Sequence, residues 1–343
     1  MPNRTWMLGV AVVFLALASL ALAGSALSGP EGDTPRWMLG ADVGTKILDA
    51  GRQHTLTIDR LDGEHLRLHG PKPQAAPPAP GEGLAAFEGL STWIDTYDTD
   101  LTPAQQVDLA AANGVQAIYL QVSRESTNGA LHDHDRLAEV IELAHDAGIR
   151  VMVWTIPAFE DPELDLARAK AAMAFVTPRG DRPDAFGLDI EVDDLADVAL
   201  RTERVLELSA ELRDWVGPDY PMAAVVLPPM QLEVNTTWWP GFPYAALAEH
   251  YDVFVPMSYS SYRGTDTVIT HQWNHDNVVR LRQLVGDPDL PVHLAGGIAD
   301  RLPEVATFVQ AAQDTGVIGA GLYDLHTTPP AAWTALQALR TDG

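Results

Sequence analysis

The sequence predicts an α/β protein whose main part is a closed barrel of eight parallel strands, each followed by a helix. Between Ala85 and the end of the chain, eight short apolar runs alternate with segments of helical periodicity. This part is about 260 residues long, which is the usual length of one (β/α)8 barrel. No glycine-rich phosphate loop follows the first run, and this disfavours the alternative, an open doubly wound sheet.

The first 29 residues are predicted to be an export segment. A short basic start is followed by an unbroken apolar run over residues 6–23, which ends in the small residues of Ala21-Leu22-Ala23. This order is typical of a secretory signal peptide, although a run of this length could also span a bilayer. We therefore expect residues 1–29 to be a cleaved signal or a single-pass membrane anchor, and the rest of the chain to be secreted or held outside the membrane.

Two further segments separate this start from the barrel. Residues 30–70 form a tether and a small β-region, in which two strand-like runs flank the turn sequence Leu61-Asp62-Gly63-Glu64. Residues 71–84 contain five prolines and few apolar side chains, as expected of a semi-rigid linker. The barrel domain is therefore predicted to occupy residues 85–343.

The eight strands of the barrel are predicted from apolar, β-rich runs of five to nine residues. They are residues 88–94, 115–123, 150–156, 185–192, 222–227, 253–259, 292–296 and 318–323. The first helix begins with a capping box formed by Thr102 and Gln105, and a later helix begins at Asp161-Pro162. Glycines at positions 114, 148 and 316 are expected to end helices just before strands.

Composition excludes several classes of function. The chain has 47 acidic and 22 basic side chains, a net charge of −25, so nucleic acid would be repelled. The absence of cysteine excludes disulfides, thiolate metal sites and cysteine nucleophiles.

His132 and His134 could serve a metal-dependent hydrolase, but they are expected to be solvated surface residues because no third ligand has metal-site spacing. We expect that the protein needs no cofactor and that it is a monomer.

The fourth strand carries the strongest functional signal. Side chains alternate along a strand, so Asp189 and Glu191 should both face the barrel interior, about 6–7 Å apart. Burial and mutual repulsion should raise the pKa of one carboxyl group. A neutral carboxylic acid beside an ionised one is what the cleavage of a glycosidic bond requires. The alternative interpretations are an ion pair with a neighbour such as Arg124 or Arg301, and a solvated strand end.

This strand resembles the D-x-x-D-x-D-x-E signature of family 18 glycoside hydrolases, the chitinases and their relatives. Asp184, Asp189 and Glu191 match three of its four acidic positions, and Gly187 stands at the remaining one. Met257-Ser258-Tyr259 on the sixth strand is similar to the M-x-Y of the same family. The resemblance is specific only at these two short motifs.

The resemblance implies an activity and three catalytic roles. Glu191 would be the general acid/base, Asp189 would orient an N-acetyl group whose carbonyl oxygen is the nucleophile, and Tyr259 would help to hold it. The expected substrate is then an N-acetylated or cell-wall glycan. Two alternatives stay open: a catalytically inactive, carbohydrate-binding barrel, and a muramidase similar to family 25 lysozymes, which also carry a D-x-E on a barrel strand.

Further side chains at the carboxyl ends of the predicted strands are candidates for binding the glycan. Aromatic rings stack on apolar sugar faces, and polar groups bind hydroxyls around the ring edges. In barrels of this class the loops that follow the strands carry the site. The candidate substrate-binding residues are Trp93, Asp95, Gln121, Trp154, Trp238, Trp239, Met257, Asp324 and His326.

Overall fold

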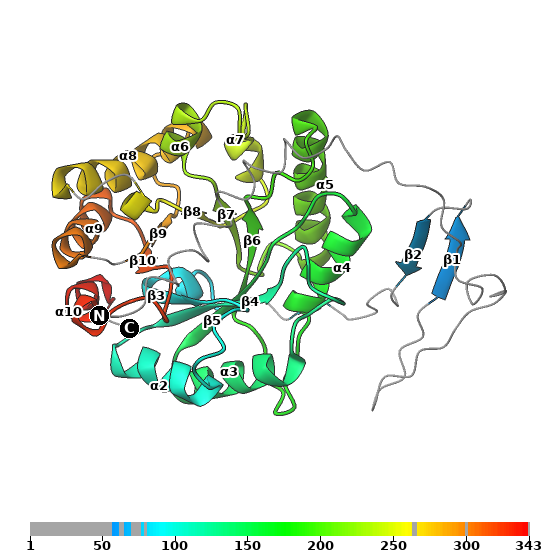
Figure 1. Ribbon diagram of the computed structural model, residues 1–343, viewed down its shortest axis with the longest axis horizontal. Coiled ribbons are helices and arrows are strands. Elements are labelled where there is room, and N and C mark those ends of the chain that lie inside the picture. The colour runs from blue at the N-terminus through cyan, green and yellow to red at the C-terminus, as the bar shows by residue number, and fades with distance from the viewer. Residues whose placement is uncertain are drawn as a thin grey trace, which may run out of the picture. The chain divides into compact units, whose positions relative to one another are not determined.

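The computed structural model describes residues 57–61, 65–69, 77–78, 81–262, 266–298 and 301–341, in two units, Met1–Pro71 and Lys72–Gly343 (Figure 1). In the first unit, β1 (Thr57–Leu61) and β2 (His65–His69) pair in antiparallel fashion, so the predicted hairpin is present. The predicted export segment lies outside the described residues. Among the described helices, none has the length and apolar character needed to cross a membrane.

The second unit is the predicted (β/α)8 TIM barrel. Its strands are β3 (Gly89–Ile94), β4 (Ala117–Ser123), β5 (Arg150–Thr155), β6 (Ala185–Ile190), β7 (Met222–Val226), β8 (Val253–Pro256), β9 (His293–Gly296) and β10 (Gly319–Leu322). They pair in parallel in the order β8-β7-β6-β5-β4-β3-β10-β9. Two bridges, Phe254 to Val292 and Met257 to Ala295, connect β8 to β9 and close the barrel. All eight predicted strands are confirmed.

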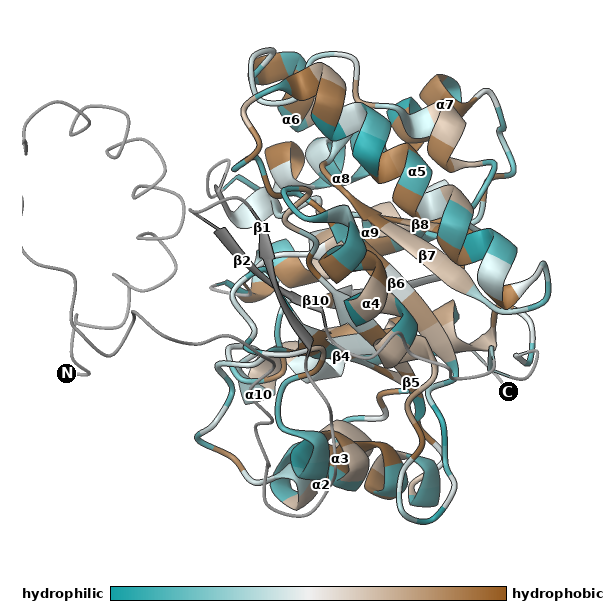
Figure 2. Cartoon of the chain, turned by 90° about the vertical axis from the view of Figure 1, so that its right-hand side faces the viewer, coloured by the Kyte–Doolittle hydropathy of each residue, from teal (hydrophilic) through white to brown (hydrophobic). Residues whose placement is uncertain are grey.

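Helices surround the strands on the outside of the barrel (Figure 1). The helical segments of this unit are η3 (Ala85–Phe87), α2 (Pro103–Ala112), α3 (His134–Asp146), α4 (Pro162–Met173), α5 (Val198–Val216), α6 (Pro229–Val234), α7 (Tyr244–Leu247), η4 (Ser260–Tyr262), α8 (Thr267–Val285), α9 (Leu302–Thr315), α10 (Pro330–Leu336) and η5 (Gln337–Leu339). The predicted capping box is present, since Thr102 and Gln105 each accept a hydrogen bond from the other's backbone N–H. In Figure 2, α5 carries both polar and apolar stretches, whereas strand β7 is apolar.

Polar side chains fill the amino-terminal half of the barrel interior. Tyr119 on β4 and His293 on β9 belong to strands that are not neighbours, yet their rings lie 4.9 Å apart, so they meet inside the barrel. His293 Nδ1 is 2.7 Å from the carbonyl oxygen of Phe87. A carbonyl oxygen can only accept a hydrogen bond, so Nδ1 carries the proton. Nε2 then accepts from the Ser91 hydroxyl at 2.7 Å. Burial lowers the pKa of His293 to about 4.

Candidate active site

Two carboxyl groups lie at the carboxyl end of β6. Asp189 is 4% exposed, and Glu191 follows the last strand residue and is half-buried. Burial raises the pKa of Asp189 well above its usual range, and the negative charge of Glu191 adds to this effect. Burial, together with the charge of Glu125, raises the pKa of Glu191 to about 7, against the opposing influence of Arg124. At neutral pH the pair therefore holds a proton that can be transferred.

The first acidic residue of the motif, Asp184, serves a different purpose. It precedes β6, at the end of the strand opposite to Glu191. Its carboxylate accepts a hydrogen bond from the backbone of Val151 at 2.7 Å and lies 3.0 Å from His145 Nε2 and 3.4 Å from Arg150 Nη1. The hydrogen bond to Asp184 also raises the pKa of His145. Asp184 thus ties the start of β6 to β5 and lies away from the proposed site.

Gly187 occupies the inner face of β6, two residues before Asp189. A Cβ atom at this position would lie 3.0 Å from Sδ of Met152 and 3.4 Å from Cβ of Trp154, both on β5. The thioether of Met152 therefore fills the space into which the family signature would place a second aspartate. Oδ1 of Asp189, two residues further along the strand, has no hydrogen-bond partner among the described residues.

The sequence reasoning missed a third carboxylate, Glu125. The pairing of β4 with β5 shifts between Gln121 and Ser123, and such irregularities redirect the side chains that follow. Arg124 binds the Glu125 carboxylate through Nη2 at 2.7 Å and Nε at 3.0 Å. Burial alone would raise the pKa of Glu125, but the hydrogen bonds and charge of Arg124 outweigh it and lower the pKa. An ionised Glu125 therefore acts on both β6 carboxyl groups. The position of Glu125 follows from the register shift between β4 and β5, which is a property of the strand pairing and cannot be predicted from the sequence of β4 alone.

A chain of aromatic rings crosses the carboxyl half of the barrel. Trp154 and Trp93 have ring centroids 5.5 Å apart, Trp93 and Tyr323 are 5.9 Å apart, and Tyr323 and Tyr259 are 6.0 Å apart. Trp93 and Trp154 are only 1% and 2% exposed, whereas the two tyrosines are half-buried. The chain connects β5, next to β6, with Tyr259 after β8. Three predicted site residues, Trp93, Trp154 and Tyr259, are thereby brought into one layer.

A second acidic group lies after β3 and β10. Carboxylate oxygens of Asp95, Asp98 and Asp324 are all within 4.8 Å of one another. Burial raises the pKa of all three, and that of Asp98 reaches about 8. The hydroxyl of Tyr323 donates to Asp95 at 2.6 Å, and the backbone of Thr327 donates to Asp324 at 2.7 Å. These donors occupy carboxylate lone pairs that a metal ion would need. The raised pKa of the three aspartates also disfavours the ionised form in which a carboxyl group binds a metal.

Other candidate binding residues have structural partners of their own. Gln121 is buried and accepts hydrogen bonds from the backbone and hydroxyl of Thr96 at 3.0 and 3.1 Å. Met257 is 5% exposed. His326 is exposed, and its Nε2 lies 3.8 Å from Asp100. Of these three, His326 presents the most accessible polar group.

The two tryptophans after β7 differ sharply in exposure. Trp239 is 1% exposed and packs against Phe159 and Phe242, with the guanidinium of Arg201 4.1 Å above its ring. Trp238 is half-buried, and its carbonyl accepts a hydrogen bond from Arg201 at 2.8 Å. Trp239 thus belongs to the core and is not part of the proposed site, whereas Trp238 is partly exposed.

The histidines considered as metal ligands lie on the surface. His132 and His134 are both exposed, and the ring of His134 stacks on Phe175 with centroids 6.0 Å apart. Within the described ranges, the group of three Asp, Glu or His side chains close enough to share a metal is the aspartate group after β3 and β10, which includes neither histidine.

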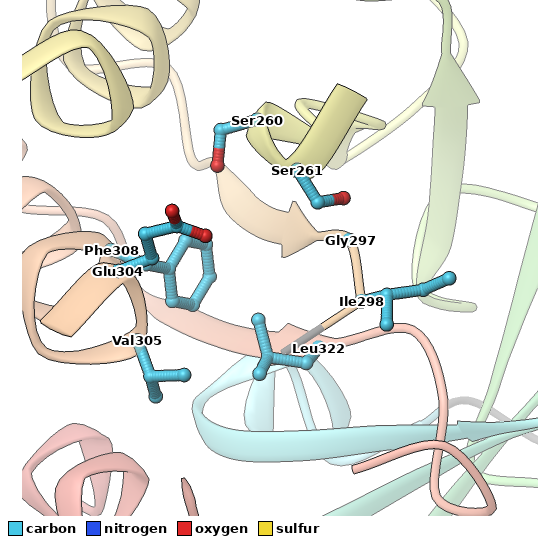
Figure 3. A pocket seen from close by; sticks show the side chains of 8 residues that line it. All are labelled: Ser260, Ser261, Gly297, Ile298, Glu304, Val305, Phe308 and Leu322. Carbon is cyan, nitrogen blue, oxygen red and sulfur yellow. The ribbon is translucent and has the colours of Figure 1, made fainter. Parts of the chain in front are cut away.

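A small cavity lies between η4, the end of β9 and α9 (Figure 3). Its volume is about 20 Å³, enough for one water molecule. The polar side of its lining comes from Ser260, Ser261 and Glu304, and the apolar side from Val305, Phe308 and Leu322. Neither Asp189 nor Glu191 lines this cavity, so it is separate from the carboxyl pair.

No protein-family model matches the chain, and no curated protein matches it. Solved structures do. An endo-1,4-beta-mannanase from Rhizomucor miehei is 12% identical, with 73% of this chain and 95% of that chain covered and a TM-score of 0.56. The spore cortex-lytic enzyme SleL from Bacillus cereus is 10% identical, with 74% of each chain covered and a TM-score of 0.56. A GH18 chitinase from Cycas revoluta is 10% identical, with 73% and 98% covered and a TM-score of 0.54. At these identities the likeness shows the barrel fold.

Proposed function

We propose that this chain is a glycoside hydrolase that cleaves glycosidic bonds in an N-acetylated or cell-wall glycan, with Glu191 as the general acid/base. The observation that carries the proposal is the pKa of about 7 of a half-buried Glu191, beside a buried Asp189 at the carboxyl end of a barrel strand. The mannanase, the cortex-lytic enzyme and the chitinase have the same barrel fold, which supports this class of substrate.

The proposed reaction has two proton transfers. Neutral Glu191 gives its proton to the glycosidic oxygen while the bond between that oxygen and the anomeric carbon breaks. The acetamido carbonyl oxygen of the substrate bonds to the anomeric carbon in this step, with Asp189 and Tyr259 holding the acetamido group. Glu191, now ionised, takes a proton from the water whose oxygen attacks the anomeric carbon. The bond between that carbon and the acetamido oxygen breaks in the same step, which regenerates the acetamido group and neutral Glu191 and frees the sugar. A pKa near 7 suits a group that acts first as an acid and then as a base.

The surroundings of the pair favour an uncharged or cationic glycan. Asp95, Asp324 and Glu125 add carboxyl groups at the same end of the barrel, and the whole chain is strongly acidic. The ionised Glu125 and the net charge of −25 would repel a polyanionic glycan. The half-buried rings of Tyr259, Tyr323 and Trp238 are the aromatic surfaces that a sugar could reach.

Replacing the proposed acid tests the function. Glu191→Gln keeps the shape of the side chain but removes its transferable proton, so turnover of chitin oligomers or peptidoglycan should fall about 100- to 10,000-fold. Product formation and glycan affinity are measured in parallel, and affinity should stay within a few-fold of wild type. The matched control is Glu139→Gln, the same change at an exposed position of α3. Equal turnover by wild type and Glu191→Gln would exclude Glu191 as the acid/base.

Gly187 favours a second candidate, a carbohydrate-binding barrel without catalytic activity. The family signature has an aspartate where Met152 fills the space beside Gly187. In this case wild type and Glu191→Gln would bind glycans equally well, and neither would release product. The choice between chitin and peptidoglycan as the substrate that is cleaved also distinguishes a chitinase-like enzyme from a muramidase.

We also propose that residues 1–29 export the protein, as a cleaved signal or as an anchor through residues 6–23, and that the barrel acts as a monomer. Sequencing the amino terminus of protein recovered from the medium and from the membrane fraction tests the export route. A start near residue 24 in the medium supports cleavage, whereas an intact Met1 in the membrane supports the anchor. Recovery of the intact chain in the cytoplasm would contradict both.

A further inference from the structure

Asp189 is a buried carboxyl group for which the described part of the chain supplies no compensating cation. It is 4% exposed, and its Oδ1 lacks a hydrogen-bond donor among the described residues. The two charged groups that act on it are Glu191 and Glu125, both acidic. The guanidinium of Arg124 is bound to Glu125 by two nitrogens and also donates to the hydroxyl of Tyr97. An ionised carboxylate in such a position would be both desolvated and repelled.

The lack of a partner follows from how β5 and β6 pack. A side chain at Gly187 would be the nearest inward neighbour of Asp189 along β6, but Met152 Sδ and Cε lie 3.0 and 3.2 Å from the position of its Cβ. These atoms are apolar, and neither can share a proton with a carboxyl group. Met152 is fully buried, so these contacts lie within the packed interior of the barrel.

We propose that Asp189 acts as a neutral carboxylic acid, which donates a hydrogen bond from its own O–H to an acceptor oxygen of the bound glycan. An ionised aspartate at this position could only accept, for example from the N–H of an acetamido group. A neutral one selects a substrate with a carbonyl or hydroxyl oxygen next to the bond that is cleaved. The role of Asp189 in binding a glycan rests on the proposed function, but the protonation state of its carboxyl group does not.

The resting protein provides the first test. Infrared spectra of the complete protein at pH 7 are recorded for wild type, Asp189→Asn and Glu191→Gln, in the region of the C=O stretch of protonated carboxyl groups. The difference spectrum of wild type minus Asp189→Asn should contain such a band, and the band should persist in Glu191→Gln. If no protonated-carboxyl band is lost in Asp189→Asn, Asp189 is ionised and the inference is wrong. This result does not depend on any turnover.

Kinetics provide the second test. Asp189→Ala removes the donor and should lower kcat/KM about 100-fold, whereas Asp189→Asn is uncharged, similar in shape and still a donor, and should recover at least about 10-fold of that loss. Melting temperatures of both variants check that each is folded. If Asn is as inactive as Ala while both are folded, a charge is required and the inference fails. Turnover that survives Glu191→Gln would instead contradict the proposed function alone.

Discussion

Gly187 and Gly321 both lie on strands inside the barrel, but a side chain would meet different obstacles at the two positions. At Gly187 the nearest atoms belong to the thioether end of Met152, which can change rotamer. At Gly321 the nearest atoms are the backbone and the hydroxyl of Ser91 on the neighbouring strand β3, which is held in the sheet. The departure from the family signature is therefore at a position with some tolerance.

Alanine at each glycine tests this difference. Gly187→Ala should change the free energy of unfolding by less than about 1 kcal/mol, because Met152 can move aside. Gly321→Ala should cost about 3 kcal/mol, because its Cβ would overlap backbone atoms of Ser91. Urea unfolding measures both values. Equal destabilisation by the two variants would mean that Met152 is held as rigidly as the backbone of β3.

The element that fixes Glu125 is the loop after β4, and α4 holds it through one residue. Arg168 is 4% exposed and donates to the carbonyl oxygens of Glu125, Thr127 and Gly129. Arg124 and Thr127 add reciprocal hydrogen bonds of 2.9 Å within the loop. Because these hydrogen bonds hold the loop from within and from α4, the charge of Glu125 keeps a constant position relative to β6.

Replacing Arg168 should therefore destabilise the protein substantially. Arg168→Met leaves the three carbonyl oxygens without their donor, and we expect a loss of about 3 kcal/mol in the free energy of unfolding. The control is Arg179→Met, which removes exposed ion pairs with Asp146 and Asp181 and should cost far less than Arg168→Met. Denaturant unfolding of the two variants gives the comparison. A cost for Arg168→Met as small as that of the control would show that the loop is held by other contacts.

Sequence periodicity predicted the elements well because each strand is an apolar run between polar loops. All eight predicted strands are present, and β5 and β7 begin at the predicted residues. Alternation along one strand predicted that Asp189 and Glu191 lie close together, and the family resemblance added Tyr259; their roles stay predictions. The contribution of Glu125 depends on a register shift between β4 and β5, and the burial of Trp239 depends on Phe159 and Phe242 from other loops. Neither is visible in a single segment of the chain.

For the whole molecule, the buried His293 couples stability to pH. Its pKa falls from the ordinary 6.5 to about 4 in the folded state, so the folded protein binds fewer protons than the unfolded chain between these values. Its contribution to stability is complete above pH 6.5 and is lost as the pH falls toward 4. Asp98 has the opposite effect: its pKa is raised to about 8, so its contribution is present below its ordinary value of 3.8 and is lost as the pH rises through 8.

The contribution of His293 is measured from two stability profiles. The free energy of unfolding of wild type and of His293→Asn is determined from pH 4 to pH 8. The difference between them should shrink by about 3 kcal/mol from pH 6.5 to pH 4, as expected for the shift in the pKa of His293. Asp98 contributes to both profiles and cancels in the difference. A difference that is constant over this range would mean that His293 does not titrate as a buried neutral group.

The aromatic chain across the barrel gives the protein an optical property. Trp93 and Trp154 are held edge to face, with centroids 5.5 Å apart, and Trp154 lies directly beside Gly187 on the strand that carries the proposed acid. Two indoles at this separation couple their electronic transitions and produce a paired positive and negative band in circular dichroism. The intensity of that band depends on the angle between the rings, so a ligand that moves either ring should change it. The protein therefore contains its own spectroscopic reporter of events at the proposed site.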